Sequence, residues 1–189
     1  SVLVPLTPKK IEVVPDPAFL LQAASKDRAK AILDDAGAPY IRTPLIGVAV
    51  RRWFHKSSSV IPYKYAAKVG LQKHRGREEM SKFITLVSAV LDDVLRQAGG
   101  HVVFMPTYNV EHEADIEVCR AIGSTMTSTA YTILQIDDPR TYKSVTGMLS
   151  IMLCGRMHAA ILAAGQGTPI VGLGYNPKFF GMFELLKQK

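Results

Sequence analysis

Apolar and polar residues follow two periods along the chain, which predict helices and buried strands in turn. The clearest helix is residues 78–98, where apolar side chains recur on one face at the 3.6-residue period. Further helices are predicted at residues 25–36, 111–122, 138–148, 156–164 and 179–187. Short apolar runs, many of them β-branched, predict buried strands at 11–14, 46–50, 101–105, 131–136, 151–154 and 169–173.

The alternation of strands and helices predicts an α/β fold, a Rossmann-like domain with a doubly wound and mostly parallel sheet. The 189 residues fit one domain, and 48% hydrophobic with 21% charged residues exclude a disordered or collagen-like chain. Apolar runs are too short to span a membrane, and two cysteines cannot build a disulfide framework. The first residues also lack the pattern of a signal peptide, so we expect a cytoplasmic location.

Positive charge is concentrated in one part of the sequence. The net charge is +7, and nine of the 23 Lys and Arg residues fall between 51 and 82, opposed only by Glu78 and Glu79. This excess of basic residues is compatible with binding to nucleic acid, to an anionic membrane surface or to a small anion, and equally with an ordinary solvated loop. Segment 51–77 has no periodicity, so we expect it to be the most mobile part of the chain.

Candidate site residues follow the predicted strands, because parallel sheets bind ligands at the carboxyl ends of their strands. Strand 151–154 is followed by Gly155, Arg156 and His158. Glycine allows a tight turn, arginine suits a carboxylate or phosphate, and histidine can transfer protons at neutral pH. The alternative is that Arg156 forms a structural ion pair and that His158 is a partly buried, satisfied imidazole.

Two further cations follow neighbouring strands. Arg51 comes directly after strand 46–50, and Lys178 follows strand 169–173 and the turn that contains Tyr175. A structural salt bridge for Arg51 and a solvated side chain for Lys178 are the alternatives. Three cations with one imidazole suit a small, multiply anionic substrate, and we expect no metal.

Other motifs carry less chemistry. His112, Glu113 and Asp115 lack metal-ligand spacing and are interpreted as residues that cap a helix and complement its dipole. Cys154 ends an apolar strand and is expected to be a core thiol. Residues 165–167 contain two glycines but follow a helix, which argues against a phosphate-binding loop.

The C-terminal third resembles the signature of the polysaccharide pyruvyl transferase family. Residues 153–164 match its Arg-x-His-Ala turn, and residues 167–178 match its Gly-x-Pro strand and Tyr-x-Pro-Lys loop. Weaker similarities lie at residues 15–21, 47–51, 103–106 and 113–115. The resemblance implies that the chain is the C-terminal domain of a two-domain, GT-B-type transferase. Residues 1–189 are therefore expected to form a single Rossmann-like domain, without the N-terminal half of the longer enzyme. Whether the chain alone is active stays open.

The family resemblance implies a reaction as well. It implies transfer of the pyruvyl group of phosphoenolpyruvate onto a pair of sugar hydroxyls, as a ketal, in cell-wall, capsular or exopolysaccharide biosynthesis. Arg51, Gly155, Arg156, Tyr175 and Lys178 would bind substrate, and His158 would be the catalytic acid–base. No cofactor is implied besides this donor. The acceptor would be carried on a lipid or a nucleotide, and the basic segment could face the inner surface of a membrane.

Three other functions remain open from the sequence. A GT-B glycosyltransferase would need an acidic residue near 174–186 to hold a nucleotide ribose, and none is convincing. A nucleic-acid module would use the aromatic residues that interleave with the basic run, Trp53, Phe54, Tyr63 and Tyr65. A non-catalytic scaffold is the third. We expect no nucleic acid partner, and the sequence does not determine the oligomeric state.

Overall fold

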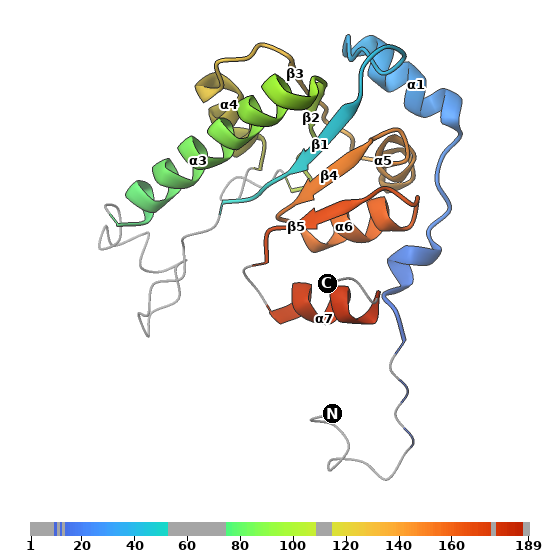
Figure 1. Ribbon diagram of the computed structural model, residues 1–189. Coiled ribbons are helices and arrows are strands. Elements are labelled where there is room, and N and C mark those ends of the chain that lie inside the picture. Colours follow the sequence, from blue (N-terminus) through green and yellow to red (C-terminus); the bar gives the residue numbers. More distant parts are fainter. Residues whose placement is uncertain are drawn as a thin grey trace.

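A computed structural model describes residues 10, 12, 14–52, 75–108, 115–174 and 177–186. Its centre is a sheet of five parallel strands in the order β3-β2-β1-β4-β5 (Figure 1). The strands are β1 (Leu45–Ala49), β2 (His101–Phe104), β3 (Tyr131–Ile133), β4 (Ile151–Cys154) and β5 (Ile170–Gly172). The sheet confirms the predicted Rossmann-like, doubly wound α/β fold.

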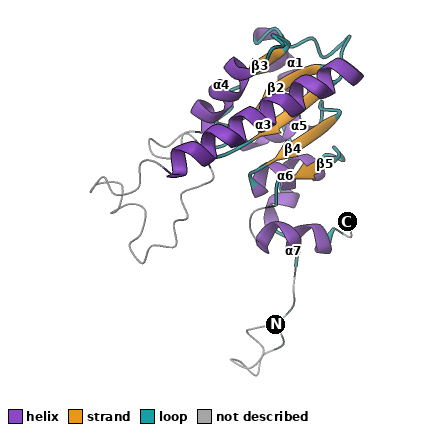
Figure 2. Ribbon diagram, turned by 60° about the vertical axis from the view of Figure 1, so that its left-hand side comes forward, coloured by secondary structure: helices purple, strands orange, loops and turns teal. Residues whose placement is uncertain are grey.

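Helices cover both faces of this sheet (Figure 2). Helices α3 (Arg75–Ala98) and α4 (Asp115–Thr125) pack on one face. Helices α1 (Lys26–Asp35), α5 (Pro139–Thr146), α6 (Met157–Ala164) and α7 (Pro177–Leu185) pack on the other, together with the short 3-10 helix η2 (Pro17–Leu20). Strand β1 shows why two cores form: Ile46 and Val48 are buried against α3 and α4, while Leu45 faces the opposite core.

The strand order reverses between β1 and β4. From β1 the chain moves to β2 and then to β3, and it returns through α5 to place β4 on the free side of β1. Ala49 in β1 is in register with Cys154 in β4, so the two strands end side by side. Open α/β sheets bind ligands at such a reversal, outside the carboxyl ends of the strands.

Several predicted boundaries need correction. The helix predicted at 78–98 begins at Arg75, and the strand predicted at 131–136 ends at Ile133 because β2, the strand with which it pairs, ends at Phe104. Glu12 and Val14, in the strand predicted at 11–14, are in no strand. Residues 53–74 lie outside the described residues, so the expected mobility of segment 51–77 stays a prediction.

Helix α4 continues past the predicted end at residue 122. It runs to Thr125 through Gly123, whose missing side chain leaves room for the ring of Tyr131: a Cβ there would come within 2.7 Å of that ring. Glycine therefore serves close packing of α4 against β3 rather than ending the helix.

A buried lysine links helix η2 to the rest of the domain through a hydrogen bond. Asp16 caps η2 by accepting from the backbone N–H of Ala18 at 2.9 Å. The Lys143 side chain, only 2% exposed, donates from Nζ to the carbonyl oxygen of Phe19 at 2.8 Å. The segment 15–21, one of the weaker family similarities, therefore has a structural role, since Ala18, Phe19 and Leu21 pack against the core that contains residues of α5 and α6.

Candidate functional site

The carboxyl ends of β1 and β4 place Arg51, Gly155 and Arg156 at the reversal of strand order. Each arginine follows the registered pair Ala49–Cys154 by two residues. The N–H of Gly155 donates to the carbonyl oxygen of Ala49 at 2.7 Å, so the two chains stay paired up to this turn. Arg51 is half-buried and Gly155 is buried. The structure thus brings Arg51 to the same place as Gly155 and Arg156, which lie about a hundred positions further along the sequence.

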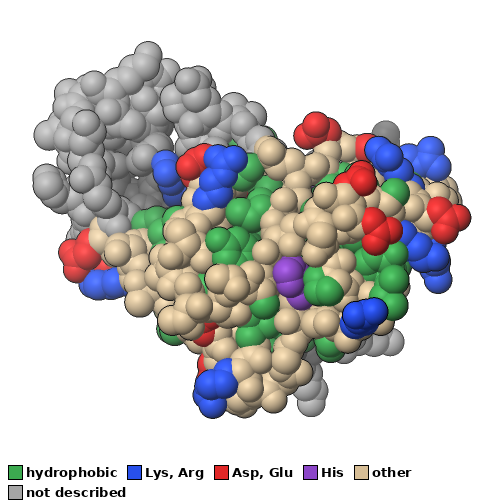
Figure 3. Space-filling model, turned by 90° about the horizontal axis from the view of Figure 1, so that it is seen from above, with side chains coloured by type: hydrophobic (Ala, Val, Ile, Leu, Met, Phe, Trp, Pro, Cys, Tyr) green, Lys and Arg blue, Asp and Glu red, His purple; other side chains and the backbone are tan. Residues whose placement is uncertain are grey.

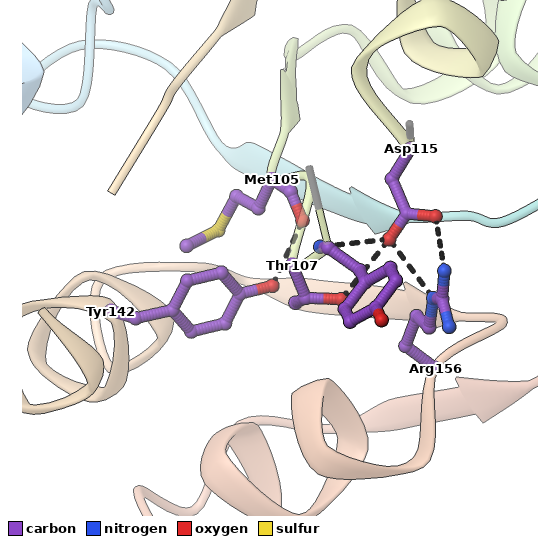
Figure 4. Close-up of polar contacts among 6 residues, drawn as sticks. Met105, Thr107, Asp115, Tyr142 and Arg156 are labelled. Atoms are coloured by element: carbon purple, nitrogen blue, oxygen red, sulfur yellow. Dashed lines mark hydrogen bonds and ion pairs between the residues drawn. The ribbon is translucent and has the colours of Figure 1, made fainter. Parts of the chain in front are cut away.

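Arg156 forms a two-pronged ion pair with Asp115, the first residue of α4 (Figure 4). Its Nε donates to Oδ2 at 2.9 Å and its Nη2 donates to Oδ1 at 2.5 Å. The Asp115 side chain is completely buried and that of Arg156 is 15% exposed. Parallel N–H donors that meet both carboxylate oxygens fix the plane of the guanidinium group.

This contact is the structural ion pair that was given above as the alternative for Arg156. Asp115 lies in the first turn of α4, as its interpretation as a residue that complements the helix dipole requires, but its side chain is bound to Arg156. Its carboxylate also accepts from the Thr107 hydroxyl at 3.2 Å and from the Tyr108 backbone N–H at 3.1 Å. The Asp115 N–H in turn donates to the Tyr108 carbonyl at 2.9 Å, which joins the two ends of the β2–α4 connection. His112 and Glu113, in that connection, lie outside the described residues.

The aromatic ring of Tyr108 covers the guanidinium group. The ring centroid lies 5.3 Å from the central guanidinium carbon of Arg156, within the range of a cation–π contact. Tyr108 is 44% exposed, so this contact lies at the surface of the site. Sequence reasoning missed the roles of Asp115 and Tyr108, because only the strand order places the end of β2 near the turn after β4.

Helix α6 begins directly after Arg156. The Arg156 side chain makes no capping hydrogen bond. The first turn of the helix is closed by the hydrogen bond that the Ala160 N–H donates to the Arg156 carbonyl oxygen. His158 is the second residue of α6, within the first turn of this helix, and is exposed. The alternative of a partly buried imidazole is therefore wrong.

Lys178 is the second residue of α7, the helix that follows β5. Because all five strands are parallel, Arg51, Arg156, His158 and Lys178 all follow carboxyl ends at one edge of the sheet. Neither the Lys178 side chain nor Tyr175 is among the described parts of the chain. Their roles, and those of the other candidate residues toward a substrate, stay predictions.

Two buried side chains near the ends of β2 and β4 are a tyrosine and a cysteine. Tyr142 in α5 donates its hydroxyl to the Met105 carbonyl at 3.0 Å, and burial raises the pKa of this phenol well above its usual value (Figure 4). Cys154 is completely buried, which confirms the expected core thiol. Burial raises the pKa of Cys154 to about 12, so this thiol is neutral at physiological pH.

We predict that neither cysteine reacts with iodoacetamide at pH 8 while the protein is folded. Burial, with a smaller effect of the Asp115 charge, also raises the pKa of Cys119 to about 12. A thiol with that pKa is about one part in 10⁴ thiolate at pH 8, and only the thiolate is alkylated. Mass spectrometry should show unmodified native protein and double alkylation in urea. Rapid labelling of Cys154 in the native state would reinstate it as a candidate nucleophile.

The described part of the chain contains neither a metal-binding cluster nor a membrane-spanning helix. No group of three or more His, Cys, Asp or Glu side chains there could hold a metal ion. No helix there is long and apolar enough to cross a membrane.

A comparison with curated proteins finds no match. A sequence model of the family described as polysaccharide pyruvyl transferase matches residues 6–177, which include β1 to β5, Arg51, Asp115, Arg156 and His158. Lys178 lies one residue beyond the match. Because this match covers most of the chain, the protein belongs to the polysaccharide pyruvyl transferase family.

Proposed function

We propose that the protein transfers the pyruvyl group of phosphoenolpyruvate to two hydroxyls of an envelope sugar and forms a ketal. Family membership supports the reaction class. The observation that carries the proposal is the set of cationic and imidazole side chains, Arg51, Arg156 and His158, where the strand order reverses. A carboxylate and a phosphate on one small donor are the anions that such a set would bind.

The reaction needs a proton donor, a proton acceptor and stabilised phosphate. The methylene carbon of the donor takes a proton and becomes a methyl group, while the carbon that carries the phosphate becomes electrophilic. One sugar hydroxyl adds to this carbon and loses its proton. The C–O bond to phosphate then breaks and inorganic phosphate leaves. The second hydroxyl adds to the same carbon and gives up its proton, which balances the proton carried away by phosphate. The net change converts phosphoenolpyruvate and a diol into a ketal and phosphate.

Each step has a candidate among the residues of the chain. His158 is exposed on the first turn of α6, where it can exchange protons with solvent between steps. Arg51 and Lys178 would hold the donor anions and stabilise charge on the departing phosphate. The uncapped start of α6 adds backbone N–H groups and the positive end of a helix dipole.

Two other functions fit the structure less well. Within the described part of residues 174–186 the only acidic residue is Glu184, which is exposed in the last turn of α7, whereas the strand ends that would hold a nucleotide ribose precede the first turn of this helix. The described residues carry 16 Lys and Arg against 14 Asp and Glu, so they form no strongly basic body. On the face that Figure 3 shows, the described residues carry both basic and acidic side chains, whereas a nucleic-acid site is typically a basic patch.

Titration of the chain with phosphoenolpyruvate tests the proposal. Isothermal calorimetry should show saturable binding that weakens as salt is added, and Arg51→Ala should weaken it about tenfold or more. Arg28→Ala is the matched control, since Arg28 is exposed on α1, which lies away from the strand arrowheads (Figure 1). Tighter binding of a nucleotide sugar, or of a short RNA, than of phosphoenolpyruvate would favour a rival function.

That the chain is the C-terminal half of a two-domain, GT-B-type enzyme also stays a prediction. We propose that the acceptor sugar lies across the same edge of the sheet, because the two hydroxyls must reach the carbon that the donor presents there. An acceptor carried on a diphosphate would add anionic groups for the basic residues near position 51.

A further inference from the structure

Asp115 makes more contacts than an ion pair needs. Four donors meet its two oxygens: the Thr107 hydroxyl, the Tyr108 N–H, and Nε and Nη2 of Arg156. The carboxylate is fully buried, and burying a charge is costly unless every lone pair has a partner. A buried carboxylate, which is costly to remove from water, thus lies at the reversal of strand order and binds an arginine that is 41 residues away in the sequence.

We propose that Asp115 is a positioning residue, which fixes the Arg156 guanidinium for the donor and lowers the net charge of the anion site. This inference rests on the proposed function. Two parallel hydrogen bonds set the plane of the guanidinium, and the Tyr108 ring lies over one of its faces. Together these contacts keep the Arg156 guanidinium in one orientation, so that it does not reorient toward each anion that binds.

The charge of Asp115 has a second consequence. It offsets the charge of Arg156, so the pair is neutral as a unit. A site of low net charge attracts a free phosphate ion weakly. Selection then depends on whether a ligand can meet several fixed contacts at once, as a donor with both a carboxylate and a phosphate does.

Asp115→Asn separates these effects, because it removes the charge at nearly constant volume. The remaining amide can face Arg156 with only one oxygen, so the guanidinium loses one of its two fixed bonds. We expect affinity for inorganic phosphate to stay equal or rise, while affinity for phosphoenolpyruvate falls. The ratio of the two affinities should drop at least tenfold. A residue that only stabilised the fold would lower both affinities together, or neither.

Tyr108 provides a variant that is safe for folding. Its side chain is 44% exposed, so Tyr108→Leu opens no core. Loss of the ring over Arg156 should reduce affinity for phosphoenolpyruvate about two- to fivefold with little change for phosphate. Tyr108→Phe keeps the ring and is the matched control, with affinities expected to equal those of the unmodified protein.

The experiment is calorimetric titration of the full chain and each variant with phosphoenolpyruvate and, separately, inorganic phosphate. A lowered affinity ratio in Asp115→Asn and Tyr108→Leu, but not in Tyr108→Phe, supports positioning. If Asp115→Asn does not fold, the affinity ratios of the two Tyr108 variants decide whether the guanidinium is positioned for the donor. An unchanged ratio with intact donor binding overturns the positioning role alone. Failure of the unmodified chain to bind phosphoenolpyruvate overturns both this inference and the proposed function.

Discussion

His158→Ala should lower turnover of phosphoenolpyruvate about 10²–10⁴-fold and leave donor affinity nearly unchanged. The side chain is exposed on the first turn of α6, so its removal opens no cavity and leaves no buried partner. The proposed role is proton transfer to the methylene carbon and from the sugar hydroxyls. Phosphate release in the presence of acceptor measures turnover, and donor titration measures affinity.

The control for this variant is His101→Gln. His101 begins β2 at the opposite edge of the sheet, where its Nε2 lies 2.7 Å from the Thr132 hydroxyl, a contact that the glutamine amide can replace. Its turnover should equal that of the unmodified protein. Turnover of His158→Ala close to that level would remove the histidine from the mechanism.

Arg156→Ala should destabilise the fold by about 3–5 kcal/mol, because it leaves a buried carboxylate without its cation. Asp115 would keep only the Thr107 hydroxyl and the Tyr108 N–H as donors. Urea unfolding followed by circular dichroism gives the free energy of unfolding. Combining the change with Asp115→Asn should recover part of the loss, since the uncompensated charge is then gone.

An exposed ion pair on α4 supplies the control for stability. Arg120 contacts Glu117 at 2.8 Å, but both side chains are more than half exposed. Arg120→Ala should therefore cost less than about 1 kcal/mol. Equal urea midpoints for the Arg156 and Arg120 variants would contradict the structural weight assigned to the buried pair.

Much of the fold could be predicted because its parallel strands are apolar on both faces and alternate with amphipathic helices. Strand 46–50 and helix 78–98 were placed within a few residues in this way. The ends of strands and helices that depend on a neighbouring element could not be predicted. Strand β3 ends when β2 ends, and α4 continues through Gly123 because Tyr131 packs there, and neither fact can be derived from local periodicity.

The candidate site shows the same division. The positions of Arg51, Arg156 and His158 after strands followed from the sequence, since a parallel sheet gathers its carboxyl ends at one edge. The partner of Arg156 did not, because Asp115 reaches it only through the spatial order of β2, β1 and β4. An acidic residue at a helix start looks like a cap unless the neighbouring strand end is known.

Transfer of an isotope-labelled pyruvyl group is the most direct test of the proposed reaction. Donor labelled at the carbon that bears the phosphate is incubated with the protein and envelope oligosaccharides that carry free pairs of hydroxyls, and the products are analysed by NMR. We predict a labelled ketal carbon on the sugar and an equal amount of inorganic phosphate. Labelled free pyruvate, or an enol ether retained on the sugar, would contradict pyruvyl transfer and indicate a hydrolase or an enolpyruvyl transferase instead.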